Sequence, residues 1–150
     1  MIQKGKTLGK RAKQLFLACR IAGLITALPV LLKVTKLPTL LRWLTPRHIQ
    51  PGALEEEAQR VIAYTDRLLG LNWLWFSPSC LTRSLVLYHF LTGFGMPVQV
   101  NFGIRKEGPP ITLSGHGWLS LKGKTYLEQG DPLPLFKIMY TFPAYWENTR

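Results

Sequence analysis

The sequence predicts an α+β protein, in which N-terminal helices precede a small antiparallel sheet. Apolar residues recur at helical spacing as far as about residue 91, and from about residue 98 onward apolar and polar residues alternate instead. Turns rich in Gly and Pro separate the alternating runs. With 150 residues, 47% of them hydrophobic, five Trp and seven Phe, the chain can build one core, which excludes a disordered protein.

Basic residues are concentrated in the first third of the chain. Residues 1–50 contain ten Lys or Arg and no Asp or Glu, whereas residues 51–150 contain nine basic and eight acidic residues. We therefore expect a basic helical N-terminal region over residues 1–50 that packs on a nearly neutral core over residues 51–150. Together they would form one compact unit.

An apolar run from Leu15 to Leu32 lies within the basic region and follows several Lys and Arg residues. A signal peptide is disfavoured because Arg20 interrupts the run and no small-residue cleavage pattern follows. A membrane span is disfavoured because the run is short, charged and contains Pro29. The favoured interpretation is one or two helices whose apolar faces pack on the core. Their basic faces would meet an anionic partner or the inner surface of the membrane.

Three further segments precede the central cysteine. A short helix is expected over Leu37–Trp43, and residues 47–52 are interpreted as a linker. A longer helix is expected from about Ala53 to Leu69, because acidic residues fill its first turn and Gly70 follows its end. The aromatic stretch Trp73–Phe76 is expected to belong to the core or to the lip of a cleft.

The last third of the chain is expected to consist mainly of strands. Residues 106–110 are predicted to form a loop, and the Pro-rich tail from Asp131 is predicted to be helical over residues 136–140. The predicted strands are Val98–Ile104, Thr112–Leu121 and Tyr126–Glu128.

Cys80 opens a predicted helix that runs to about Leu91, with Ser77 or Ser79 as its N-cap and Gly93 near its end. Only a thiolate is a competent nucleophile, and the N-terminus of a helix favours a negative charge. The same backbone N–H groups could hold an oxyanion. The alternative for a lone cysteine in an apolar context is a small buried side chain.

His116 stands between two glycines at the start of a predicted hairpin. If Ser120 faces Lys124 across the turn, His116 faces Glu128, and the carboxylate can fix the orientation of the imidazole. Asp131 is the second choice for this acid, since a bulge or a longer loop could bring it to the histidine. A structural histidine and an exposed strand carboxylate are the alternatives without catalysis.

Three motifs occur in an order that resembles a known family. They are the run from Cys80 to Gly95, the strand that ends in Phe102-Gly103-Ile104-Arg105, and Gly115-His116-Gly117-Trp118. Over about residues 55–140 the chain is similar to the transglutaminase-like core of lasso peptide biosynthesis B2 proteins, which are related to the microcin J25 processing protein. The resemblance implies a papain-like or transglutaminase-like fold.

The resemblance also implies a function. Proteins of this family are cysteine peptidases that remove the leader from a ribosomally made precursor peptide, before a separate ATP-dependent lasso cyclase closes the ring. A small separate protein recognises the leader. Cys80 would be the nucleophile and His116 the general base. Glu128 stands where the family commonly has aspartate, and Gly117 where it usually has alanine.

Two other functions stay open at this point. One is a non-catalytic scaffold that binds a peptide or a membrane through the basic region, and the other is an acyl transferase that passes the thioester to an amine. No cofactor is expected. His48 and His89 lack partners at metal-ligand spacing, and no phosphate-binding loop is present.

Partners and compartment follow from composition. The basic region is aliphatic, without a helix or sheet suited to reading bases, so nucleic acid is not an expected partner. Cys19 and Cys80 form no disulfide framework, which favours the cytoplasm, with contact to the inner membrane surface through the basic region. Cys19 is expected to serve packing.

Overall fold

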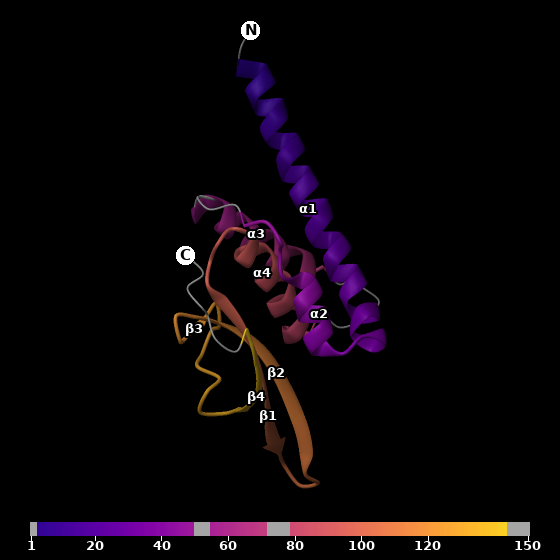
Figure 1. The fold of residues 1–150 in the computed structure, drawn as a ribbon, viewed down its shortest axis with the longest axis vertical. Helices are drawn as coiled ribbons and strands as arrows, with labels where there is room; N and C mark the ends of the chain where they lie inside the picture. The colour runs from indigo at the N-terminus through magenta and orange to yellow at the C-terminus, as the bar shows by residue number, and fades with distance from the viewer. Residues whose placement is uncertain (1–2, 50–54, 72–78, 144–150) are drawn as a thin grey trace.

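The protein consists of a layer of four helices on one side and a four-stranded antiparallel sheet on the other (Figure 1). The computed structural model describes residues 3–49, 55–71 and 79–143, with side chains from residue 9 onward. The predicted α+β class is confirmed. The predicted linker after residue 49 and the stretch Trp73–Phe76 lie outside the described residues, as does Ser77.

The N-terminal region forms two helices. One continuous helix, α1 (Gln3–Val34), contains Pro29 in its last turns, and α2 (Leu37–Leu44) follows with a proline in its first turn. The short helix predicted after residue 36 is therefore confirmed. The N-terminal part of α1 projects beyond the other helices (Figure 1). Its C-terminal half packs on the core through three side chains that are at most 1% exposed: Ile21, Ile25 and Leu28.

Helices α3 (Glu55–Leu69) and α4 (Cys80–Gly93) are also confirmed as predicted. Both contact α1, and α4 lies between the other helices and the sheet. Its interior residues are buried nearly throughout, and Tyr88 also shares a hydrogen bond of 2.9 Å with the hydroxyl of Thr45 at the end of α2. Burial of this kind is the main source of stability in a domain of this size. Helix α4 is thus the central element of the fold.

The sheet has the strand order β3-β2-β1-β4. The strands are β1 (Val98–Glu107), β2 (Thr112–Leu121), β3 (Lys124–Tyr126) and β4 (Lys137–Phe142). Strands β1 and β2 agree with the prediction, except that β1 continues through two residues that were predicted to form a loop. One face of the sheet packs against the helices and contributes Val98, Val100 and Leu119 to the shared core.

Two predictions about the sheet are wrong. Ser120 pairs with Thr125 and Leu121 with Lys124, one position away from the predicted register. Lys122 and Gly123 both have positive φ, 51° and 77°, so the turn has two central residues, as in a type I′ hairpin, rather than three. The third strand also ends at Tyr126, before the predicted residues 127 and 128.

The tail prediction is wrong as well. Residues 137–142 form strand β4, which pairs with β1. Strands β2 and β3 and their connections separate β4 from β1 in the sequence. A strand stabilised by a partner that lies far away in the sequence leaves little local signal. The segment therefore completes the sheet on its second edge.

Candidate active site

Cys80 is the first residue of α4, and the residues around it cap the helix. The Ser79 hydroxyl accepts the backbone N–H of Thr82 at 3.0 Å, and the Ser79 carbonyl accepts that of Arg83 at 3.1 Å. Within the described residues, the N–H groups of Cys80 and Leu81 have no acceptor. Cys80 is half-buried, and its sulfur lies at the positive end of the helix, beside N–H donors that have no acceptor in the described part of the chain.

Strand β2 approaches this helix end unusually closely. The backbone N–H of Gly117 donates to Sγ of Cys80 at 3.4 Å. A Cβ atom at Gly117 would lie only 3.0 Å from Cα of Leu81, so a side chain there would push the strand and the helix apart. The hydroxyl of Ser84 lies 3.0 Å from the carbonyl oxygens of both Cys80 and Gly117. Glycine and serine together hold β2 against the first turn of α4.

His116 precedes Gly117 and pairs with a carboxylate. Its Nε2 lies 3.2 Å from Oε2 of Glu128, and both side chains are about one-fifth exposed, 23% and 19%. Because a carboxylate only accepts, Nε2 of the neutral ring carries the hydrogen and Nδ1 keeps the free lone pair. No hydrogen bond joins the imidazole directly to Sγ among these described atoms; Gly117, next to His116 in the chain, makes the contact to the sulfur.

Glu128 reaches His116 in spite of the wrong register prediction. After β3 ends, Leu127 has a positive φ of 61°, and the chain leaves the strand pairing. The carbonyl of Leu127 accepts a hydrogen bond of 3.0 Å from Arg83, whose guanidinium also lies 3.7 Å from Oε1 of Glu128. The turn is therefore held by α4 itself rather than by the hairpin.

Arg83 is a residue of this site that the sequence analysis did not identify. Its guanidinium binds both carboxylate oxygens of Asp66 on α3, at 2.7 and 3.2 Å. That hydrogen bond raises the pKa of Arg83, and the charges of Asp66 and Glu128 act in the same direction against partial burial. Its position three residues after Cys80, on the same side of the helix, is the signal that could have indicated it.

Asp131, the second choice for the acid, is engaged elsewhere. Its Oδ1 accepts hydrogen bonds from the Thr125 hydroxyl at 3.0 Å and from the backbone N–H of Leu133 at 3.1 Å. These contacts are those of a residue that stabilises a turn. The structure thus brings Cys80, His116 and Glu128 to one end of α4 and leaves Asp131 outside this group.

Residues 24–141 match the family model of the transglutaminase-like superfamily. The chain belongs to this superfamily. The match includes most of the described fold, from the second half of α1 to β4, and the superfamily contains cysteine peptidases and transglutaminases. No curated protein and no solved structure matches the chain.

Aromatic rings enclose the histidine of this transglutaminase-like domain. The ring of Trp118 lies parallel to that of His116 at 5.8 Å, and the ring of Phe136 lies 5.1 Å from it. Gly103 makes this packing possible, since a Cβ there would lie 2.9 Å from the Trp118 ring. Phe136 comes from the tail whose strand was not predicted, so the sequence analysis missed it. The rings restrict the orientation of the imidazole and keep water from that side.

Proposed function

We propose that the protein is a cysteine peptidase that hydrolyses the amide bond between leader and core of a ribosomally made lasso precursor peptide. The observation that carries the proposal is the pair of contacts around β2. Gly117 donates its N–H to the sulfur of Cys80, and the adjacent His116 is paired with Glu128. Membership of the transglutaminase-like superfamily and the motif resemblance support the same chemistry.

The proposed reaction has two halves: formation of a thioester on Cys80 and hydrolysis of that thioester. His116 takes the thiol proton at Nδ1, and the thiolate of Cys80 attacks the carbonyl carbon of the scissile amide. The N–H of Cys80, which has no acceptor among the described residues, donates to the oxyanion. The tetrahedral intermediate expels the amine, which receives the proton from His116, and leaves a thioester. Water then gives its proton to His116, attacks the thioester and releases the carboxylic acid and the thiol.

Glu128 has the role of orienting the base. Its charge stabilises the imidazolium that forms during both halves of the reaction, and its hydrogen bond keeps the hydrogen on Nε2. Arg83 is proposed to be a positioning residue, because it contacts Glu128 and the preceding carbonyl but not His116. On the resemblance, a separate leader-recognition protein delivers the precursor and an ATP-dependent lasso cyclase consumes the product.

The decisive experiment compares Cys80→Ala with Cys19→Ala. Cys19 was predicted to serve packing, but it is an exposed free cysteine on α1, so that prediction is wrong and the residue serves as the matched control. The full chain is incubated with precursor and recognition protein, and products are identified by mass spectrometry. We expect Cys80→Ala to abolish leader release and Cys19→Ala to leave it unchanged. Unchanged release by Cys80→Ala would contradict the peptidase and favour a scaffold.

The same mass spectra distinguish hydrolysis from acyl transfer. Hydrolysis yields a leader fragment with a free carboxylic acid, whereas transfer adds the mass of an amine present in the reaction. We expect the free acid even when a primary amine is supplied in excess. An amine adduct as the main product would instead identify a transglutaminase-type transferase.

A further inference from the structure

The outward face of α1 is apolar and has no partner among the described residues. Leu15, Phe16, Val30 and Val34 are 67%, 67%, 61% and 74% exposed. The opposite face carries the three α1 side chains that are buried in the core. Between Lys13 and Lys33 the sequence contains a single charged residue, Arg20. Exposed apolar surface of this extent marks an interaction site.

The length of this helix suggests a membrane, and its packing indicates how the helix would lie. The stretch Gly9–Val34 is long and apolar enough to cross a membrane, and only 17% of its apolar window is buried in the structure. Crossing would withdraw Ile21, Ile25 and Leu28 from the core and expose to water the apolar surface of α3 and α4 that α1 covers. The helix can instead keep these contacts and lie along the surface of a bilayer.

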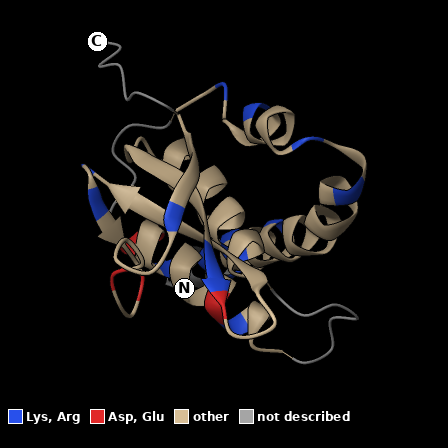
Figure 2. Ribbon diagram, turned by 90° about the horizontal axis from the view of Figure 1, so that it is seen from below, with Lys and Arg blue, Asp and Glu red and all other residues tan. Residues whose placement is uncertain are grey.

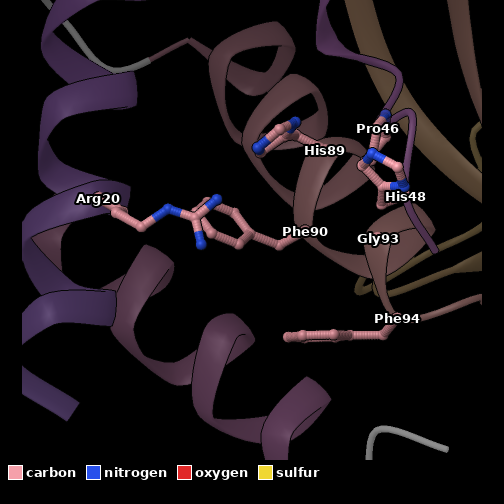
Figure 3. A pocket seen from close by; sticks show the side chains of 7 residues that line it. All are labelled: Arg20, Pro46, His48, His89, Phe90, Gly93 and Phe94. Atoms are coloured by element: carbon pink, nitrogen blue, oxygen red, sulfur yellow. The ribbon is translucent and has the colours of Figure 1, made fainter. Parts of the chain in front are cut away.

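Arg20 lies at the edge of the apolar face, and its guanidinium is packed against aromatic rings. Its guanidinium packs over the ring of Phe90 at 5.2 Å (Figure 3). It also lies 6.0 Å from the centre of the Phe16 ring. Among the described residues, no hydrogen bond joins its guanidinium to a carboxylate or a carbonyl. Two rings therefore fix the plane of the guanidinium while its N–H donors stay open, which suits the oxygens of a phosphate.

Two cavities meet at Arg20, and the charged residues that line them are mostly basic. One, of about 130 Å³, is also lined by His48 and His89 (Figure 3), and the other, of about 320 Å³, by Lys10, Lys13 and Arg60. Glu57 is the one acidic residue in either lining. In the view of Figure 2, the helices at the right carry basic segments, while the acidic first turn of α3 (Glu55, Glu56 and Glu57) is not visible there. Because Arg60 is paired with Glu56 at 3.2 Å, the positive charge available at these cavities comes from Arg20, Lys10 and Lys13. These three residues attract anions.

We propose that α1 docks on an anionic phospholipid bilayer. Arg20 and the lysines at the edge of α1 hold lipid phosphates, while the outward face from Leu15 to Val34 enters the boundary of the acyl chains. A lipid surface offers anionic oxygens and a wide apolar layer together, as this face requires. A second copy of the chain would instead place the same cations opposite one another, which is repulsive.

Vesicle co-sedimentation of the full chain tests this proposal independently of cleavage. The vesicles contain phosphatidylcholine alone or phosphatidylcholine with a minority of phosphatidylglycerol. We expect binding to the anionic vesicles at least about tenfold stronger than to the neutral ones. Arg20→Gln should weaken binding about fivefold, and the double variant Leu15→Ser with Val30→Ser about tenfold or more.

The chain offers matched controls at the far side of the sheet. Ile111 is 75% exposed in the turn between β1 and β2, and Lys106 is exposed on β1. Ile111→Ser and Lys106→Gln should bind vesicles like the wild type. All five changed side chains are exposed and lie outside the core, so equal melting temperatures should show that the variants are folded.

Any of four results would overturn the proposal. The first is equal binding to neutral and anionic vesicles, and the second is unaltered binding by the double variant. The third is a dimer in solution that the double variant abolishes without any vesicle binding, which would assign the face to a second copy. Inorganic phosphate should reduce vesicle binding no more than chloride of equal ionic strength; stronger displacement would assign Arg20 to free phosphate instead of lipid.

Discussion

Glu128 and Asp131 stand three residues apart, yet their surroundings give them different tasks. Glu128 faces the imidazole of His116, whereas Oδ1 of Asp131 accepts hydrogen bonds from Thr125 and Leu133. We therefore expect Glu128→Gln to lower kcat about 10²-fold, because an amide neither stabilises the imidazolium nor fixes the tautomer. Steady-state assays of leader release would measure this. If Asp131→Asn lowered kcat by a similar factor and Glu128→Gln did not, Asp131 rather than Glu128 would be the acid that orients His116.

Arg83 contacts Glu128 and the carbonyl of Leu127 but not His116 itself. Its ion pairs are partly exposed, so their loss should cost no more than about 1 kcal/mol of unfolding free energy. Arg83 positions Glu128 and Leu127, so Arg83→Gln should nevertheless lower kcat about tenfold, which is less than the full loss of general-base catalysis would cost. KM should be nearly unchanged. Asp66→Asn, which removes only the outer partner, should have a smaller effect. If the loss of kcat in Arg83→Gln were fully explained by the fraction of protein that is unfolded, Arg83 would have a merely structural role.

At the scale of elements, the close approach of β2 to α4 determines the site. The approach depends on Gly117, where a Cβ would meet the backbone of α4 at 3.0 Å. A branched side chain must displace the strand that carries His116. We expect Gly117→Val to destabilise the fold by about 1–3 kcal/mol and to abolish leader release under conditions where the variant is still folded. Urea denaturation and activity assays at low temperature separate the two effects.

Gly115 provides a control on the same strand. It is exposed, and the nearest atoms to a Cβ there belong to the Phe102 side chain, at 3.1 Å, rather than to a backbone. Since a side chain can move, Gly115→Ala should retain most of the activity. If Gly117→Val were as active as Gly115→Ala, the close approach would have no part in positioning the sulfur and the base.

The elements also show where sequence analysis succeeds. Helices α2, α3 and α4 were predictable because caps, periodicity and stop signals are local. The hairpin register was not, because one residue more or fewer in the turn changes every pairing and Lys122 adopts a positive φ without being glycine. Strand β4 and with it Phe136 were missed because their partner is distant in the chain. Arg83 was missed because its role depends on Asp66, which lies on another helix.

For the whole molecule, the question is whether the basic N-terminal region belongs to the cooperative unit. Ile21, Ile25 and Leu28 of α1 share one hydrophobic cluster with residues of α4 and the sheet. The family match begins at residue 24 and so includes this part of the helix. The same helix exposes its other face along its length. One element therefore combines a structural face with a face available for a partner.

A pair of substitutions on α1 tests this division. Ile25 is 1% exposed and Val30 is 61% exposed, so truncation to alanine removes core packing at one position and only surface at the other. Ile25→Ala should lower the unfolding free energy by about 2–5 kcal/mol, because it leaves a cavity between α1 and the central helix. Val30→Ala should change it by less than about 0.5 kcal/mol. Urea denaturation followed by circular dichroism and by tryptophan fluorescence should give one coincident transition in each variant. If Ile25→Ala unfolded at the same urea concentration as Val30→Ala, or if the two signals separated, α1 would be an appendage and the core would be stable without it.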